Sequence, residues 1–339
     1  MAKILITGGT GYIGSHTAVE LLNNNHEIFI IDNLSNSKIQ VLEYIQKITG
    51  KKPQFYLVDL KNKQQIADFC KNHAPFDLVI HMAAFKFVAE SIQKPLLYYH
   101  NNLSSTINLL QAIHDFCPNA KLLFSSSCTV YGMPDFLPLT EEHPLKIPTS
   151  PYGKTKQFME LAIKDLTNAL DNFYALSLRY FNPIGAHESL LIGESPLKTY
   201  NLMPLLVAVA AGKIPVFKIY GSDYPTPDGT PIRDYIHIMD LAHAHALAVD
   251  YLLNNPKLPK YSAFNIGLGK GFSVLQIIKK FEQISGKKIN YIFAPRRPGD
   301  VPEIYASAEK AKKILNWKPK YSLHDMIKTA WLWEINKKF

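Results

Sequence analysis

One glycine-rich stretch constrains the fold of this chain more than any other sequence feature: Thr7-Gly8-Gly9-Thr10-Gly11-Tyr12-Ile13-Gly14. The apolar run before it, at residues 4–6, predicts a buried parallel strand. Apolar residues at Ala18, Leu21 and Leu22 predict a helix that begins at Gly14. Because glycines lack side chains, the backbone can approach a pyrophosphate, and the free N–H groups of the helix N-terminus attract the anion. The stretch therefore predicts a strand–loop–helix turn that holds phosphate.

A second apolar run, residues 28–31, ends in an acid, Asp32, which lies 18 residues after Gly14. In dinucleotide-binding folds a carboxylate at about this distance binds the hydroxyls of the adenosine ribose. The order of strand, loop, helix, strand and acid thus predicts a dinucleotide site. A carboxylate would repel a 2′-phosphate, so Asp32 favours NAD over NADP.

Strand and helix patterns alternate along the first half of the chain. Apolar runs predict strands at residues 54–59, 77–81, 121–124 and 175–180, and helical patterns occupy 41–48, 95–116 and the segment from Tyr152. This alternation indicates an α/β fold with a doubly wound parallel sheet of the Rossmann type, whose ligands bind at the carboxyl ends of the strands. After Asn182 the alternation loosens into segments rich in proline and glycine. We predict an NAD-binding Rossmann domain over 1–182, with returning elements near 235–267, and a smaller mixed α/β substrate-binding domain over 183–339.

Composition and spacing argue against several other function classes. The 339-residue chain has a formal net charge of +9, but its lysines are scattered, so we expect no nucleic-acid partner. Its three cysteines lack pairing or metal spacing, which indicates a reducing compartment. His243 and His245 would point to different faces of a helix, so we expect no metal site. No run reaches transmembrane length and the first strand begins at once, so we expect a cytoplasmic protein without a signal peptide or membrane contact.

A tyrosine and a lysine, Tyr152 and Lys156, stand four residues apart at the start of a predicted helix and therefore lie one above the other. A free phenol, with a pKa of about 10, is a poor base at neutral pH. Lowering that pKa by about three units requires about 4 kcal/mol, which the lysine ammonium and a bound nicotinamide cation would supply together. Ser127, at the end of the preceding strand, would hydrogen-bond the same substrate hydroxyl. The trio predicts an alcohol/ketone site in which Tyr152 moves the proton and NAD takes the hydride.

Several longer motifs make the chain resemble one known family. They are GGTGYIGSH at 8–16, FSSSCTVYG at 124–132, SPYGKTK at 150–156, RYFNPIGAH at 179–187, DYPT at 223–226, RDYIH at 233–237 and APRRPGD at 294–300. With these, essentially the whole chain resembles the UDP-glucose 4-epimerases of the extended short-chain dehydrogenase/reductase superfamily. The resemblance implies reversible inversion at C4 between UDP-glucose and UDP-galactose, through a transient 4-keto sugar and a tightly held NAD.

The resemblance also implies which residues bind each ligand, with Ser127, Tyr152 and Lys156 as the catalytic trio. The residues implied for NAD are Gly8, Gly11, Tyr12, Ile13, Gly14, Asp32, Asn33, Asn36, Ser37, Asp59, Leu60, Met82, Ala83, Ala84, Lys86, Asn101, Ser125, Tyr152, Lys156 and Phe181. Those implied for the UDP-hexose are Lys86, Ser127, Tyr152, Asn182, Asn201, Leu202, Tyr220, Arg233, Arg297, Asp300 and Ile304. A homodimer is implied too, with the helices near 95–116 and 152–170 packed together.

Two positions depart from the pattern of the family. Ile304 occupies the position beside the C2 substituent of the sugar, where members confined to unmodified hexoses tend to have a large aromatic residue and dual-specificity members a small one. Isoleucine is intermediate in size, so we hypothesise some activity on UDP-GlcNAc and UDP-GalNAc. Ala84 stands where glycine is common, and its methyl group would slightly reshape the nicotinamide pocket.

Two alternative functions remain open at this point. Another NAD-dependent nucleotide-sugar enzyme, a dehydratase or decarboxylase, would need an added acid or base, usually just after the fifth strand. That place holds Cys128, Thr129 and Val130, none of them acidic. A catalytically silent NAD-sensing regulator would keep the fold and lose the chemistry, but the trio of Ser127, Tyr152 and Lys156 is intact.

Overall fold

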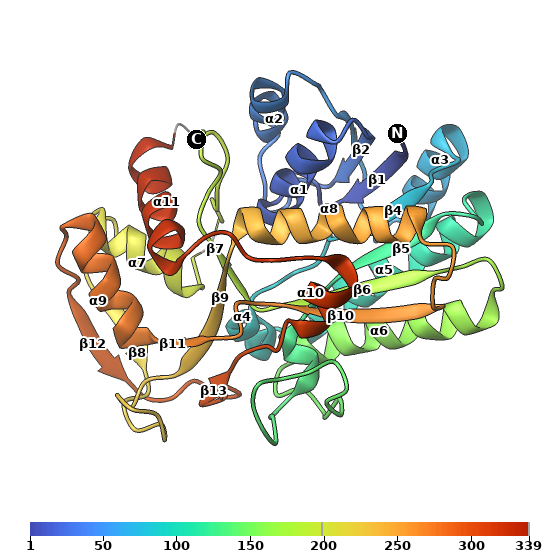
Figure 1. The fold of residues 1–339 in the computed structure, drawn as a ribbon. Coiled ribbons are helices and arrows are strands. Elements are labelled where there is room, and N and C mark those ends of the chain that lie inside the picture. The colour runs from blue at the N-terminus through green and yellow to red at the C-terminus, as the bar shows by residue number, and fades with distance from the viewer. Residues whose placement is uncertain (198, 338–339) are drawn as a thin grey trace.

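A seven-stranded parallel sheet forms the centre of the larger lobe in the computed structural model, which describes residues 1–197 and 199–337 (Figure 1). The strands are β1 (Lys3–Thr7), β2 (Glu27–Asp32), β3 (Gln54–Leu57), β4 (Leu78–His81), β5 (Lys121–Ser127), β6 (Ala175–Tyr180) and β10 (Tyr261–Ile266). They lie in the order β10-β6-β5-β4-β1-β2-β3, and all neighbours are parallel. The predicted doubly wound sheet is confirmed, with its strand order reversing between β1 and β4, where such sheets bind ligands.

Helices cover both faces of this sheet because its strands are apolar on both sides. Successive residues of a strand point to opposite faces, so Ile4 and Ile6 enter one core while Leu5 enters the other. The first core lies under α1 (Tyr12–Asn23), α2 (Val41–Thr49), α8 (Ile238–Asn254) and α10 (Glu309–Leu315). The second lies under α3 (Lys63–His73), α5 (Pro95–Phe116) and α6 (Pro151–Ala169), with the short α4 (Val88–Gln93) beside α5 and α6.

The smaller lobe, on the left in Figure 1, is built from short strands and three helices. One sheet contains β7 (Asn182–Ile184), β9 (Ile232–His237), β11 (Gly271–Ser273) and β13 (Glu303–Ile304), and a second pairs β8 (Phe217–Tyr220) with β12 (Tyr291–Ala294). The helices are α7 (Leu202–Ala210), α9 (Val274–Ser285) and α11 (Leu323–Asn336). They share a separate apolar core that includes Leu206, Phe281 and Ile327.

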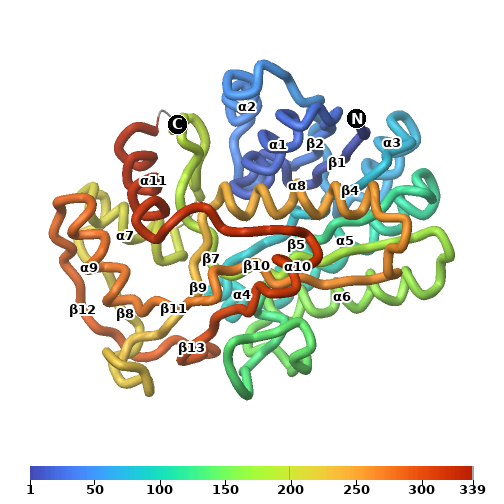
Figure 2. Tube along the Cα trace, in the orientation of Figure 1, coloured from blue at the N-terminus to red at the C-terminus, as the bar shows by residue number. Residues whose placement is uncertain are grey.

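The chain passes repeatedly between the two lobes, as the trace in Figure 2 shows. After β9 it returns through α8 and β10 to the large sheet, and after β13 it returns again through α10, which packs on α8 and β10. The second return lies outside the segment 235–267 that the sequence analysis assigned to returning elements. The division of the chain into domains at residue 182 stays a prediction. Among the described residues, no helix combines the length and apolar character needed to cross a membrane.

Most predicted elements of the first lobe match the structure closely. Residues 95–116 and 175–180 have the predicted bounds. Helix α1 begins at Tyr12 rather than Gly14, because Gly11 in extended conformation is its N-cap. Strand β3 ends at Leu57, before Asp59.

Candidate active site

A cavity of about 720 Å³ lies between the two lobes. The carboxyl ends of β1, β2, β4, β5 and β6 form one wall, and residues of α7, β8, β9 and β13 form the facing wall. Every residue predicted to bind NAD or the UDP-hexose lines this cavity, together with the three predicted catalytic residues. The structure therefore brings the predicted site residues together, while their individual ligand contacts remain predictions.

The glycine-rich loop fits the close approach of a phosphate group. Gly8 has a φ of +72°, and a Cβ there would lie 2.9 Å from the backbone of Ala83. A Cβ on Gly14 would lie 2.4 Å from the carbonyl oxygen of Gly8. Gly11 caps α1 without a side-chain hydrogen bond, which leaves the helix N-terminus facing the cavity. The loop thus has the open backbone and the helix dipole that a pyrophosphate of a dinucleotide requires.

Asp32 is held at the end of β2 by its neighbours. Its carboxylate accepts hydrogen bonds from the backbone N–H groups of Thr10 at 3.2 Å and Leu34 at 2.9 Å, and from the Ser37 hydroxyl at 3.3 Å. These bonds fix the side chain beside the glycine loop, where a ribose would follow the pyrophosphate. The residues present therefore fit a dinucleotide that has a free ribose 2′-hydroxyl.

The predicted catalytic trio meets on the first-lobe wall. Ser127 ends β5, and Tyr152 and Lys156 lie on the first turns of α6. That helix begins there because Ser150 accepts a hydrogen bond from the Gly153 N–H at 3.2 Å and a proline fills the first helical position. The Lys156 ammonium donates to the Ser125 carbonyl at 2.6 Å. All three side chains are buried, as acid–base chemistry away from bulk water requires.

The pKa values of Tyr152 and Lys156 differ from the sequence-based expectation of a phenol with a lowered pKa beside a lysine cation. Burial raises the pKa of Tyr152 to about 12, although its hydrogen bond with Ser127 opposes the shift. Burial lowers the pKa of Lys156 to about 7, although the nearby Glu160 carboxylate opposes that shift. The Lys156 ammonium points to the Ser125 carbonyl. In this structure burial thus favours the neutral phenol of Tyr152, and the hydrogen bond with Ser127 favours the phenolate.

The facing wall presents cationic side chains. Arg233 forms an ion pair with Asp300, with 3.2 Å between Nη2 and Oδ1. The Arg297 guanidinium stacks over the ring of Tyr220, 3.9 Å from its centroid. Planar guanidinium groups bind phosphate oxygens through paired, charge-assisted hydrogen bonds. This wall therefore fits the pyrophosphate and base of a nucleotide.

Sequence reasoning missed three residues of this region. Glu194 lines the cavity and accepts a hydrogen bond from the Lys86 ammonium at 2.8 Å, but it lies in an irregular segment with no pattern to mark it. Glu160 and Arg179 form a buried ion pair behind the trio, with 2.6 Å between Nη2 and Oε2. A signal for this pair did exist, because Glu160 follows Lys156 by one helical turn and Arg179 is the charged residue in a mostly apolar strand.

Comparisons with known proteins point in one direction. The family model described as GDP-mannose 4,6 dehydratase matches residues 5–330. A UDP-glucose 4-epimerase of Drosophila melanogaster is 48% identical, over 98% of this chain and 96% of its own length. One of Bacillus subtilis is 46% identical, over 98% and 96%. The crystal structure of the UDP-glucose 4-epimerase of Bifidobacterium longum, in complex with NAD⁺ and UDP, superimposes with a TM-score of 0.93 at 42% identity, covering 98% of each chain.

Proposed function

Because the chain belongs to the UDP-glucose 4-epimerase family, within the wider group described by the GDP-mannose 4,6 dehydratase model, we propose that it interconverts UDP-glucose and UDP-galactose with NAD as cofactor. One observation carries the proposal. A single cavity contains the glycine loop and Asp32, the trio of Ser127, Tyr152 and Lys156, and the arginines of the facing wall. A dinucleotide and a nucleotide sugar thus meet at one proton-transfer group.

The side chains of the cavity divide the reaction between them. NAD, when bound, accepts a hydride from C4 and later returns it. Tyr152 takes the proton of the 4-hydroxyl and gives it back, and Ser127 hydrogen-bonds the same oxygen. The Lys156 ammonium and the positive charge of an oxidised nicotinamide both favour the phenolate over the phenol, against the burial that raises the pKa of Tyr152. Inversion requires that the hydride return to the face of C4 opposite the one it left, so the keto sugar must turn over while the arginines hold the nucleotide.

A single incubation tests the proposal against its two alternatives. Purified protein is mixed with UDP-galactose without added NAD, and the product is identified by NMR or chromatography. UDP-glucose is the expected product. A stable 4-keto-6-deoxy sugar would instead identify a dehydratase, and no turnover of a protein that still binds NAD would favour the regulator. The structure favours the first outcome, because no carboxylate occupies the turn Cys128–Tyr131 (η1) after Ser127.

Assembly as a homodimer through α5 and α6 is part of the same proposal. Ile107 on α5 and Phe158 and Leu161 on α6 are large apolar residues with 59%, 46% and 46% of their surface exposed. The two helices pack side by side, so adjacent elements each expose large apolar residues that a partner surface could cover. Light scattering should give twice the chain mass of 38.3 kDa. Phe158→Glu should give the monomer, whereas Phe293→Glu, at an equally exposed site on β12, should not.

The protein is also proposed to work in a reducing, cytoplasmic setting. Cys70, Cys117 and Cys128 are buried free thiols. Such thiols persist where disulfides are kept reduced. Fractionation of cells that express the tagged protein should place it with cytoplasmic markers.

A further inference from the structure

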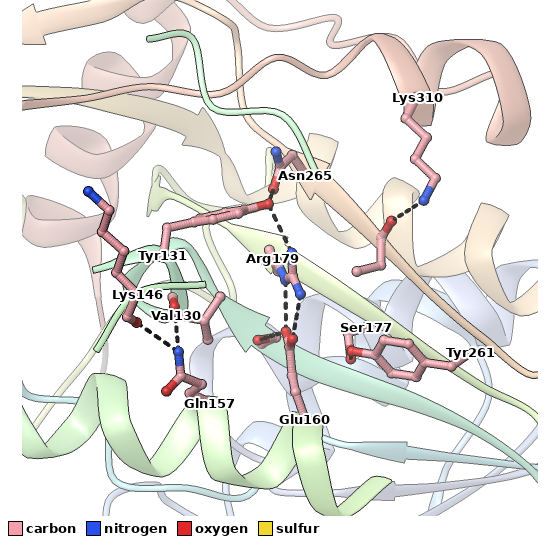
Figure 3. A network of polar contacts seen from close by, with 12 residues as sticks. Val130, Tyr131, Lys146, Gln157, Glu160, Ser177, Arg179, Tyr261, Asn265 and Lys310 are labelled. Atoms are coloured by element: carbon pink, nitrogen blue, oxygen red, sulfur yellow. Dashed lines mark hydrogen bonds and ion pairs between the residues drawn. The ribbon is translucent and has the colours of Figure 1, made fainter. Parts of the chain in front are cut away.

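Behind the catalytic trio, Glu160 on α6 forms the centre of a buried polar network (Figure 3). Its carboxylate accepts hydrogen bonds from Arg179 Nε at 3.0 Å and Nη2 at 2.6 Å, and from the Ser126 hydroxyl at 2.5 Å. Burying a carboxylate and a guanidinium costs several kcal/mol unless each is well paired, and an apolar pair of similar volume would often be as stable. Stability alone therefore gives a weak reason for these charges.

The network forms hydrogen bonds with the chain before and after Ser127. On one side, Ser126 donates to Glu160. On the other, Arg179 Nη1 donates to the hydroxyl of Tyr131 at 3.1 Å, and Tyr131 donates in turn to Asn265 Oδ1 at 2.7 Å. Tyr131 ends the 3₁₀ turn that directly follows Ser127. The strand end and the turn on either side of Ser127 are thus fixed to the same ion pair, and Figure 3 shows its contact with Tyr131.

A neighbouring contact shows that α6 holds this turn a second time. The side-chain amide of Gln157 donates to the Val130 carbonyl at 3.1 Å and to the Lys146 carbonyl at 2.8 Å. Gln157 directly follows Lys156 in the sequence. The helix that carries Tyr152 and Lys156 is therefore joined to the segment that carries Ser127 through the charged Glu160 and the uncharged Gln157, whose contacts Figure 3 shows.

Glu160 also acts on Lys156 through its charge. The two residues lie one turn apart on α6 and are both buried. Burial lowers the pKa of Lys156 to about 7, and Glu160 is the group that opposes this shift. An adjacent carboxylate favours the charged ammonium, so its removal would make Lys156 lose its proton at a lower pH.

The histidine and the tyrosines that face this region are buried, and burial favours their neutral forms. Burial lowers the pKa of His81 on β4 to about 3 and raises those of Tyr131 and Tyr152 to about 12. It also raises the pKa of Tyr180 on β6 and of Tyr261 on β10 above the ordinary value. Two further charged side chains lie against β10 on the Arg179 side: Glu141 accepts a hydrogen bond from the Asn265 N–H at 2.7 Å, and Lys310 donates one to the Ala263 carbonyl at 2.9 Å. Both act on Arg179 through their charges, whereas Glu160 is the carboxylate that acts on Lys156.

We propose that Glu160 and Arg179 are positioning residues for the reaction, which hold Ser127 in place through Ser126 and Tyr131 and keep Lys156 cationic. The inference rests on the proposed function, because it assigns these residues to the same proton transfer. Its electrostatic half is nevertheless measurable without turnover, from the titration of Lys156 itself.

The test combines NMR and kinetics on the full chain. The protein is labelled with ¹³Cε-lysine, and the Lys156 signal is assigned by its absence in Lys156→Met. Glu160→Gln should lower the Lys156 titration midpoint by about one unit or more, since it leaves the Arg179 charge uncompensated. With UDP-galactose, the pH at which kcat falls on the alkaline side should move down by a similar amount. Glu160→Gln/Arg179→Met should return the midpoint toward wild type, while kcat stays low because Ser126 and Tyr131 have lost their anchor.

The control is Asp165→Asn, which makes the same carboxylate-to-amide change at an exposed position of α6 and should leave both readouts unchanged. If Glu160→Gln does not fold, Ser126→Ala supplies the test: it removes one hydrogen bond, leaves the ion pair, and should lower kcat severalfold with KM unchanged. A wild-type Lys156 midpoint in folded Glu160→Gln, or a wild-type kcat in Ser126→Ala, overturns the inference. An inactive wild-type protein overturns the proposed function instead, and the NMR titration stays informative.

Discussion

On the first-lobe wall of the cavity, the expected binding surface is formed mainly by main-chain groups. On the second-lobe wall it is formed mainly by charged side chains. The glycine loop approaches its ligand through bare backbone, and Asp32 is fixed by two backbone N–H groups. The facing wall presents Arg233 and Arg297, whose guanidinium groups are held by Asp300 and Tyr220. Ligand binding at the first-lobe wall should therefore be weakened by adding a side-chain atom to the glycine loop. Binding at the second-lobe wall should be weakened by removing an arginine charge.

This difference suits the two ligands that we propose. A cofactor that must stay bound between turnovers gains from a rigid, close-fitting backbone cradle. A nucleotide sugar that must enter, turn and leave is better held by a few strong ionic contacts to its pyrophosphate, which leave the sugar free. Cofactor retention and nucleotide binding should therefore respond to different substitutions.

The largest effect is expected at Tyr152, which belongs to the first-lobe wall and which we propose contacts both ligands. Tyr152→Phe removes the proton-transfer group and should lower kcat on the order of 10²- to 10⁴-fold. Because the glycine loop, Asp32 and the arginines of the facing wall are all unchanged, NAD content and calorimetric binding of UDP should match wild type. Tyr291→Phe, an exposed tyrosine on β12, is the control. Near-normal turnover in Tyr152→Phe would mean that another group moves the proton.

The next effect is specific to the backbone-built wall. Asp32→Ala removes the carboxylate expected to bind the ribose hydroxyls, and should weaken NAD retention on the order of 10- to 100-fold, as the loss of charge-assisted hydrogen bonds predicts. UDP affinity should not change. Cofactor content is measured by releasing NAD from denatured protein and assaying it enzymatically, with the exposed Asp68→Ala as control. Unchanged NAD content would remove the role assigned to Asp32.

On the wall of charged side chains, we expect a smaller effect of the opposite kind: weaker UDP binding with unchanged NAD retention. Arg297→Lys keeps the charge but loses the planar fork and its stacking on Tyr220, so UDP should bind about tenfold more weakly. NAD content should stay at the wild-type level. If Arg297→Lys released NAD, the two walls would not be independent, and the comparison drawn between them would fail.

The sequence predicted the two walls unequally, for a physical reason. On the first lobe, each element is recognised from residues close together in the chain: an apolar strand, its glycine loop, and the four-residue spacing of Tyr152 and Lys156 on a helix. On the second lobe, β9 pairs with β7, β11 and β13, and β8 pairs with β12 from more than seventy residues away. Strands of two to six residues that depend on such distant partners show no local pattern. The family resemblance predicted the cavity residues there, but not the strands that hold them.

The network behind the trio was missed for a related reason. Glu160 and Arg179 come from a helix and a strand, and each alone is an ordinary charged residue. Only the fold shows that they meet, and that they join Ser126 and Tyr131 on either side of Ser127. The same holds for the Lys156 pKa, because the spacing of Tyr152 and Lys156 does not show the burial that lowers it to about 7.

The smallest effect concerns substrate choice at Ile304, on the second-lobe wall. Its side chain is 5% exposed, lines the cavity and shares an apolar cluster with Tyr131, Phe181 and Val301. Pockets discriminate one or two methylenes only modestly. Wild-type protein should turn over UDP-GlcNAc slowly, Ile304→Ala should raise the ratio of kcat/KM for UDP-GlcNAc over UDP-galactose about threefold to tenfold, and Ile304→Tyr should abolish UDP-GlcNAc turnover. NAD content should be constant across the series, since β13 pairs with β9 and not with the large sheet. If wild-type protein gives no UDP-GalNAc at high enzyme concentration, isoleucine at this position already closes the pocket, and size alone does not set the specificity of this wall.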